Sequence, residues 1–249
     1  MIRYGDLQLL PNKGEYLIIA CDSSGGIGNK ENDIIKIGPE LAGFFAAFVP
    51  IVEVLATKGK ILSIVDTLSV EMEPTGKRII SGIKEALTSV GLDSNLLTGS
   101  TEDNIPTSST GIGVTVIGSI SKPKLERKAI PIGSDLVLVG IPKVGQEFLD
   151  EELVGNARET LTLELMMLLS KEDMVLDMIP VGSKGINYEA GVLSCRHNRE
   201  INLNLNLNID YTKSAGPSTC LLVAIDPKNQ DQFINNYQEI PINIIGRFK

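Results

Sequence analysis

Apolar residues in the first half of the chain recur with the periods of both helices and strands. Between residues 74 and 91 they return every three or four positions, which predicts a helix with one face in the core. Residues 39–59 are more uniformly apolar and predict a buried helix that begins at Pro39 and is kinked by Pro50. Short apolar runs bounded by turn-forming residues predict strands over residues 7–10, 16–21, 61–65 and 113–118.

The second half predicts a mixture of shorter elements. A helical pattern covers residues 146–170, and Asp226-Pro227 precedes a last helix that runs toward Tyr237. Apolar residues alternate strictly with asparagine over residues 201–209, which predicts a half-exposed strand; an asparagine ladder along a polar groove is the alternative. Further strands are predicted over residues 135–139, 174–179, 190–194, 219–225 and 242–245.

A charged, proline-containing connector over residues 122–128 separates the two halves. We therefore expect two domains, residues 1–121 and residues 122–249. A chain of 249 residues is long enough to bury an apolar core in either arrangement without disulfide bonds.

The charge balance limits the kinds of partner. The chain has 31 acidic and 23 basic residues, a net charge of −8, which argues against nucleic acid as the main partner. Its three cysteines form no paired spacing, so they predict neither a zinc site nor a disulfide framework, and a cytoplasmic location fits best. The most apolar stretch, residues 41–56, contains Glu53 and is shorter than the roughly 20 residues of a membrane-spanning helix. We expect no membrane partner.

The sequence also excludes several catalytic mechanisms. The single histidine, His197, lies in a polar segment that predicts a solvated loop, so histidine-based catalysis is disfavoured. Neither glycine-rich segment, residues 25–30 or residues 111–118, has the spacing of a P-loop or of a dinucleotide-binding turn. Any catalysis would therefore depend on carboxylates, backbone amides, hydroxyl groups and a hard metal ion.

Carboxylates follow several of the predicted strands. Asp22 and Asp66 each end an apolar run, and residues 102–104 lie in a loop rich in serine, threonine and glycine. Magnesium needs only one or two carboxylates when substrate phosphates supply the other oxygens. These segments therefore predict a magnesium–phosphate site, with ordinary turn formation as the alternative.

The order of these elements resembles the N-terminal half of the aminoimidazole ribonucleotide (AIR) synthetase superfamily, which includes thiamine-monophosphate kinase and selenophosphate synthetase. The resemblance covers about residues 1–145. It implies an α+β fold with two domains: an N-terminal mixed or antiparallel sheet packed with helices, which binds ATP and dimerises, and a smaller α/β domain that binds a small-molecule substrate. It also implies a homodimer that uses ATP and Mg²⁺.

The resemblance assigns roles to particular residues. Asp22 matches a strand-end metal-binding aspartate, and residues 98–101 take the place of a Gly-Gly-acid-Thr loop, so Ser100 stands where a carboxylate is usual. Ile51 replaces another family aspartate, for which Glu53 is the candidate substitute. The implied catalytic residues are Asp22, Glu102 and Asp103, and the implied metal ligands are Asp22, Glu53 and Asp103. The implied cofactor-binding residues are Gly25, Gly26, Thr98, Gly99, Ser100, Thr101 and Asn104.

Residues 98–104, 68–76 and 143–145 also resemble the α-ribazole kinases of cobalamin salvage. This second resemblance implies ATP-dependent phosphoryl transfer to the hydroxyl group of a nucleoside-like or vitamin-precursor molecule. Two alternatives remain open: an ATP-dependent synthetase like AIR synthetase, and a nucleotide-binding relative without catalytic activity.

Overall fold

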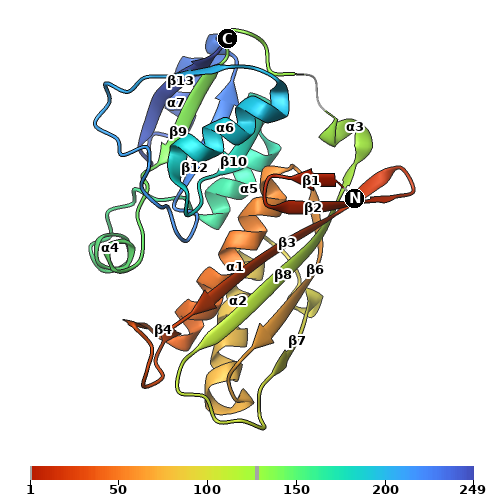
Figure 1. Cartoon of the computed structure of the whole chain (residues 1–249), viewed down its shortest axis with the longest axis vertical. Helices are drawn as coiled ribbons and strands as arrows, with labels where there is room; N and C mark the ends of the chain where they lie inside the picture. Colours follow the sequence, from red (N-terminus) through yellow and green to blue (C-terminus); the bar gives the residue numbers. More distant parts are fainter. Residues whose placement is uncertain (1, 127–128) are drawn as a thin grey trace. The chain divides into compact units, whose positions relative to one another are not determined.

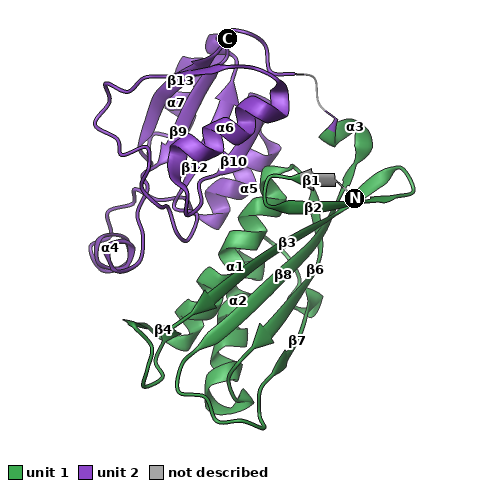
Figure 2. Ribbon diagram, viewed as in Figure 1, with its two compact units in different colours: residues 1–125 green, residues 126–249 purple. Residues whose placement is uncertain are grey.

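The computed structural model describes residues 2–126 and 129–249, which form two compact units, residues 1–125 and 126–249 (Figure 2). The domain boundary predicted after residue 121 falls at the first residue of the short helix α3 (Lys122–Leu125), within unit 1. The last two residues of the predicted connector, 127 and 128, lie outside the described residues.

Unit 1 is built on a six-stranded sheet with the order β1-β2-β3-β8-β6-β7. Neighbouring strands are antiparallel except for β6 and β7, which are parallel, so the sheet is mixed as expected. A separate parallel pair consists of β4 (Ile27–Gly28) and β5 (Ile35–Lys36). The strands of the main sheet are β1 (Ile2–Tyr4), β2 (Leu7–Asn12), β3 (Glu15–Gly25), β6 (Lys60–Leu68), β7 (Leu97–Thr101) and β8 (Gly111–Ser121).

Two helices form a layer on one face of this sheet (Figure 1). Helix α1 (Pro39–Ala56) packs on β3 and β8, and α2 (Lys77–Ser89) packs on α1. A Cβ atom at Gly82 would lie 1.7 Å from the Glu40 carbonyl oxygen, and one at Gly43 would lie 2.1 Å from the Ile79 carbonyl oxygen. Glycine at these two positions therefore lets the helix backbones touch.

Helix α1 is long and apolar enough to cross a membrane by length and composition, but 67% of its residues are buried inside the structure. Its apolar character is explained by packing, because it lies between α2 and the sheet. The alternation of β3 matches this arrangement: Tyr16, Ile18 and Ala20 are buried, whereas Cys21 and Ser23 on the opposite face are exposed. A short π-helical turn (Met72–Gly76) and a 3₁₀ turn (Ser94–Leu96) flank α2.

Unit 2 contains a five-stranded sheet with the order β10-β12-β9-β13-β11, antiparallel at every pairing. Its strands are β9 (Asp135–Gly140), β10 (Val175–Pro180), β11 (Ile201–Leu203), β12 (Cys220–Ile225) and β13 (Ile242–Phe248). Its helices are α4 (Gln146–Phe148), α5 (Leu163–Lys171), α6 (Gly185–His197) and α7 (Gln230–Asn236). A π-helical turn (Leu149–Val154) follows α4, and a 3₁₀ turn (Pro227–Asn229) precedes α7.

Three predictions for the second half are wrong in detail. The helix expected over residues 146–170 is interrupted between α4 and α5, and the strand expected over 201–209 ends at Leu203. Residues 190–194 belong to α6, in which Ile186, Ala190 and Leu193 are buried at helical spacing. A five-residue apolar window is too short to separate strand from buried helix.

His197 is also placed differently from the prediction. It is the last residue of α6, only 8% exposed, and its Nε2 lies 2.7 Å from Oδ2 of Asp177. The Arg196 guanidinium donates to the same oxygen at 2.9 Å. The segment that looked like a polar loop is therefore the buried end of a helix, anchored to β10.

Candidate functional site

The ends of four strands of unit 1 line an open hollow of about 500 Å³. It lies where β3, β6 and β7 end and where β8 begins. Four residues predicted from the sequence line it, namely Gly25, Ser100, Thr101 and Glu102. The other lining residues are Ser23, Ser24, Thr67, Leu68, Ser69, Gly111, Ile112 and Gly113.

The strand register explains why hydroxyl groups gather here. Ser23 of β3 is opposite Gly113 of β8, Gly113 is opposite Thr67 of β6, and Thr67 is opposite Ser100 of β7. Ser23, Thr67 and Ser100 are exposed, on the face away from α1. A Cβ at Gly113 would lie 2.5 Å from Thr67 Oγ1, so glycine leaves room for that hydroxyl group. The sheet thus presents a row of hydroxyls with a glycine between them.

The adjacent row points to the other face. Asp22 is opposite Val114, Val114 is opposite Asp66, and Asp66 is opposite Gly99. Because side chains alternate along a strand, Asp22 lies on the helix side of the sheet and not among the exposed hydroxyls. Burial raises the pKa of Asp22 above its ordinary value. Its assignment to catalysis and to a metal stays a prediction.

Glu102 and Asp103 shape the turn that follows β7. Asp103 accepts hydrogen bonds from the Met72 amide at 2.8 Å and from the Thr101 hydroxyl at 2.7 Å. These bonds hold the pKa of Asp103 below its ordinary value. One oxygen of Glu102 accepts from the amides of Asn104, at 2.8 Å, and Ile105, at 3.2 Å. Asp103 therefore braces the loop, while the Glu102 residue lines the hollow.

The predicted metal set of Asp22, Glu53 and Asp103 is not assembled. Glu53 lies beside Val54 on α1, and Val54 packs over Gly118 of β8, where a Cβ would lie 2.7 Å from Val54 Cγ1. Gly118 is opposite Ile18 of β3. Asp22 is four residues further along β3, a distance of about 14 Å, so this part of α1 does not lie over Asp22. Among the described residues, no three or more His, Cys, Asp or Glu side chains are placed to share a metal ion. The sequence could not reveal this, because it does not fix the level at which α1 crosses the sheet.

The donor set does suit magnesium that arrives with a nucleotide. Within the described part of the chain, the residues lining the hollow include Glu102 but no lysine, arginine or histidine. One carboxylate together with phosphate oxygens is a usual ligand set for Mg²⁺. Glu102 would hold the ion. The ion would in turn neutralise the negative charge of the phosphates, for which the lining has no positively charged side chain.

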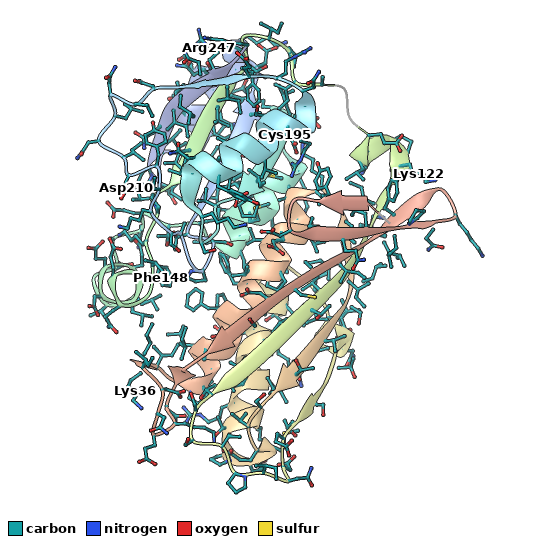
Figure 3. All side chains as sticks on the ribbon, in the orientation of Figure 1. Lys36, Lys122, Phe148, Cys195, Asp210 and Arg247 are labelled. Atoms are coloured by element: carbon teal, nitrogen blue, oxygen red, sulfur yellow. The ribbon has the colours of Figure 1, made fainter. Side chains whose placement is uncertain are left out.

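A tightly held loop leads out of the hollow. Gly26, with φ of +71°, starts the turn after Gly25, and its amide donates to the Thr110 carbonyl at 2.9 Å. Further along, Asp33 is only 4% exposed and fixes the loop to residues 109 and 110. Lys36, labelled in Figure 3, closes the loop by donating to the carbonyl groups of residues 30 and 31. Gly25 is thereby held at the rim of the hollow.

The remaining predicted cofactor-binding residues do not line the hollow. Thr98 and Gly99 lie on the edge strand β7, and Asn104 is exposed in the turn that follows it. Conversely, the hydroxyls of Ser23, Thr67 and Ser69 were not singled out from the sequence. Their signal was the presence of small polar residues at two strand ends, which becomes specific only once the strand order is known.

Comparison with solved structures identifies the class of fold, although no family model and no curated protein matches the chain. Over 98% of its length, the chain has the AIR-synthetase-like fold, which confirms the expected α+β architecture. Thiamine-monophosphate kinase from Aquifex aeolicus has 15% identity and a TM-score of 0.65, with 89% of that chain covered. The enzyme from Stenotrophomonas maltophilia also has 15% identity, a TM-score of 0.62 and 89% coverage of that chain.

A third similar structure is PurL from Thermotoga maritima in complex with ATP. It has 16% identity and a TM-score of 0.62 over 98% of this chain, which spans 42% of the PurL chain. A further similar structure is a thiamine-monophosphate kinase (ThiL) complexed with AMPPCP and TMP. It has 16% identity and a TM-score of 0.65 over 98% of this chain and 84% of that chain.

Proposed function

We propose that this protein is an ATP-dependent kinase that transfers a phosphoryl group to a small molecule. The observation that carries the proposal is the hollow, which joins a glycine turn, exposed hydroxyls and Glu102 at the ends of four strands. The similar structures include thiamine-monophosphate kinases, one of them bound to AMPPCP and TMP, and support the same class of reaction.

The chemistry suits the residues at the site. Phosphoryl transfer depends on positioning and charge neutralisation more than on a protein nucleophile. The hydroxyl groups of Ser23, Thr67 and Ser100 can donate hydrogen bonds to phosphate oxygens, and the glycine backbone at residue 25 allows close approach. Glu102 would hold magnesium brought by the nucleotide. The positive charge of that magnesium ion would favour departure of the transferred phosphoryl group from the nucleotide.

We propose α-ribazole as the phosphoryl acceptor, with thiamine monophosphate as the comparison substrate. The motif at residues 98–104 supports the first, and the structural similarity to thiamine-monophosphate kinases supports the second. A nucleotide-binding relative without activity is a separate candidate, because Ser100 takes the place of a usual carboxylate.

The proposal includes a cytoplasmic homodimer. The sheet face opposite α1 carries Leu17, Ile19 and Ile117, which are only partly buried within the single chain. A second copy would cover these apolar side chains. Multi-angle light scattering at micromolar concentration should give twice the mass of 26.8 kDa; a monomer at that concentration would remove the dimer from the proposal.

Phosphorus NMR tests the reaction directly. The protein is incubated with ATP and Mg²⁺, and with α-ribazole, thiamine monophosphate or no acceptor. A kinase gives ADP together with a new phosphomonoester or diphosphate signal that depends on one acceptor. ADP with free phosphate and a condensed product indicates a synthetase, and binding of ATP without turnover indicates a non-catalytic relative; either result contradicts the kinase proposal.

A further inference from the structure

A buried carboxylate lies directly behind the wall of the hollow. Asp66 is 2% exposed, and within the described part of the chain its Oδ1 has no hydrogen-bond partner. The Ser100 amide donates a hydrogen bond to this carboxylate. Leaving a buried charged oxygen unpaired is costly, so a core position without another role would favour an apolar residue.

The contact between Asp66 and Gly99 is complementary in shape. A Cβ added at Gly99 would lie 1.9 Å from Oδ1 and 2.4 Å from Cγ of Asp66. The carboxylate therefore fills the space that a side chain at residue 99 would occupy. β7 is the edge strand of the sheet and has β6 as its neighbour, so its local position depends on contacts of this kind.

The same contact acts on the residues that line the hollow. Ser100 and Thr101 directly follow Gly99 and form the β7 side of the hollow. The exposed hydroxyl row lies on the opposite face of the sheet from Asp66, so Asp66 would act through the strand and would not touch a ligand.

We propose that Asp66 is a positioning residue that fixes Ser100 in the wall of the hollow and places a negative charge behind it, which selects metal-bound over metal-free phosphate. This inference rests on the proposed nucleotide site and adds a residue to it. It predicts that the charge of Asp66 contributes to the affinity for metal-bound ATP and that the shape of its side chain contributes to stability, and that the two contributions can be separated.

The charge is tested with Asp66→Asn, which keeps the shape. Calorimetry measures the affinity for ATP with Mn²⁺ and for ATP in excess EDTA, and the Mn²⁺ electron paramagnetic resonance signal reports metal uptake without turnover. The Mn²⁺–ATP dissociation constant should rise on the order of tenfold, with a smaller change for metal-free ATP. Asp135→Asn is the control for loss of a buried carboxylate outside unit 1: Asp135 is a fully buried strand aspartate of unit 2 whose Oδ2 also has no partner among the described residues, while its Oδ1 accepts from Arg247 at 2.8 Å.

The shape is tested by a double substitution. Gly99→Ala should lower the melting temperature, because the new methyl group meets the carboxylate. Asp66→Ala combined with Gly99→Ala should recover part of that loss but not the affinity for Mn²⁺–ATP. A double variant no more stable than Gly99→Ala would overturn the proposed fit.

Unchanged Mn²⁺–ATP affinity in Asp66→Asn would overturn the inference while leaving the nucleotide site in place. Wild-type protein that binds neither form of ATP would remove the proposed function and this inference together. The two failures are therefore distinguishable.

Discussion

Replacing Asp33 by asparagine should loosen the loop that leads out of the hollow. The Asp33 carboxylate accepts four hydrogen bonds: at Oδ1 from the Thr110 amide at 2.7 Å and the Ser109 hydroxyl at 3.0 Å, and at Oδ2 from the Thr110 hydroxyl at 2.7 Å and the Lys30 amide at 2.8 Å. An asparagine side chain offers one oxygen, which can accept two of the four bonds, and its amide group can donate to the hydroxyl group on the other side, because a hydroxyl also accepts. In either orientation one backbone amide, that of Lys30 or that of Thr110, loses its acceptor.

The expected cost has two parts. The backbone amide that loses its acceptor gives up a hydrogen bond to a charged group, which contributes about 1.5–3 kcal/mol, and the bonds that remain lose the charge of their acceptor. We expect about 3 kcal/mol in total, which corresponds to roughly a hundredfold change in the opening equilibrium. The pKa of Asp33 supports a large contribution: burial raises it, yet the hydrogen bonds from Thr110, Lys30 and Ser109 hold it below its ordinary value.

Amide hydrogen exchange measures this opening. The Thr110 amide and the Gly26 amide, which donates to the Thr110 carbonyl, should each lose about two orders of magnitude of protection in Asp33→Asn. Asp93→Asn is the control, because exposed Asp93 caps the single amide of Asn95. Exchange at Thr110 that matches wild type would refute the view that Asp33 fixes the loop.

Three further predictions concern other carboxylates and their partners. Glu102→Gln should weaken Mg²⁺–ATP binding about tenfold by calorimetry without lowering the melting temperature; a larger loss of binding in Asp103→Asn would contradict these assignments. Burial raises the pKa of Asp66 to about 6, so its charge destabilises the folded state as pH rises above the ordinary value of 3.8. The metal-free Asp66→Asn variant should therefore exceed wild type in stability by about 2–3 kcal/mol in urea denaturation at pH 7.5 and match it near pH 3.5; equal stability at both pH values would refute this. Lys143→Met should destabilise unit 2 by about 3–5 kcal/mol in thermal melts, because Lys143 is 2% exposed and its removal leaves the buried carboxylate of Glu152, 2.6 Å away, without this cation. An unchanged melting temperature would show that the pair is dispensable for stability.

The sequence predicted those elements whose pattern is local. The helix over 74–91 is confirmed as α2 and the end of the π-helical turn Met72–Gly76 that precedes it, because its apolar residues repeat over several turns. The window at 190–194 is too short to show its period, and it belongs to α6. Local periodicity therefore identifies long elements and leaves short ones ambiguous.

The candidate site was predicted only in part, for a different reason. Gly25, Ser100, Thr101 and Glu102 line the hollow, and they were singled out chiefly because the resemblance to the AIR-synthetase superfamily implied them. Whether Asp22 or its neighbour Ser23 faces the hollow depends on which side α1 covers, and one residue of shift reverses the answer. Asp33 gave no signal at all, since its partner Thr110 is 77 residues away and a lone aspartate in a loop is typical of a turn.

The pairing of β3 with β8 also leads to an expectation about the order in which unit 1 folds. It joins residues 15–25 to residues 111–121, so the hollow requires closure of a very long loop. The contact between α1 and α2 spans far fewer residues and can form earlier. We therefore expect the hollow to form late in folding, so that a state containing only the two paired helices would lack the proposed nucleotide site.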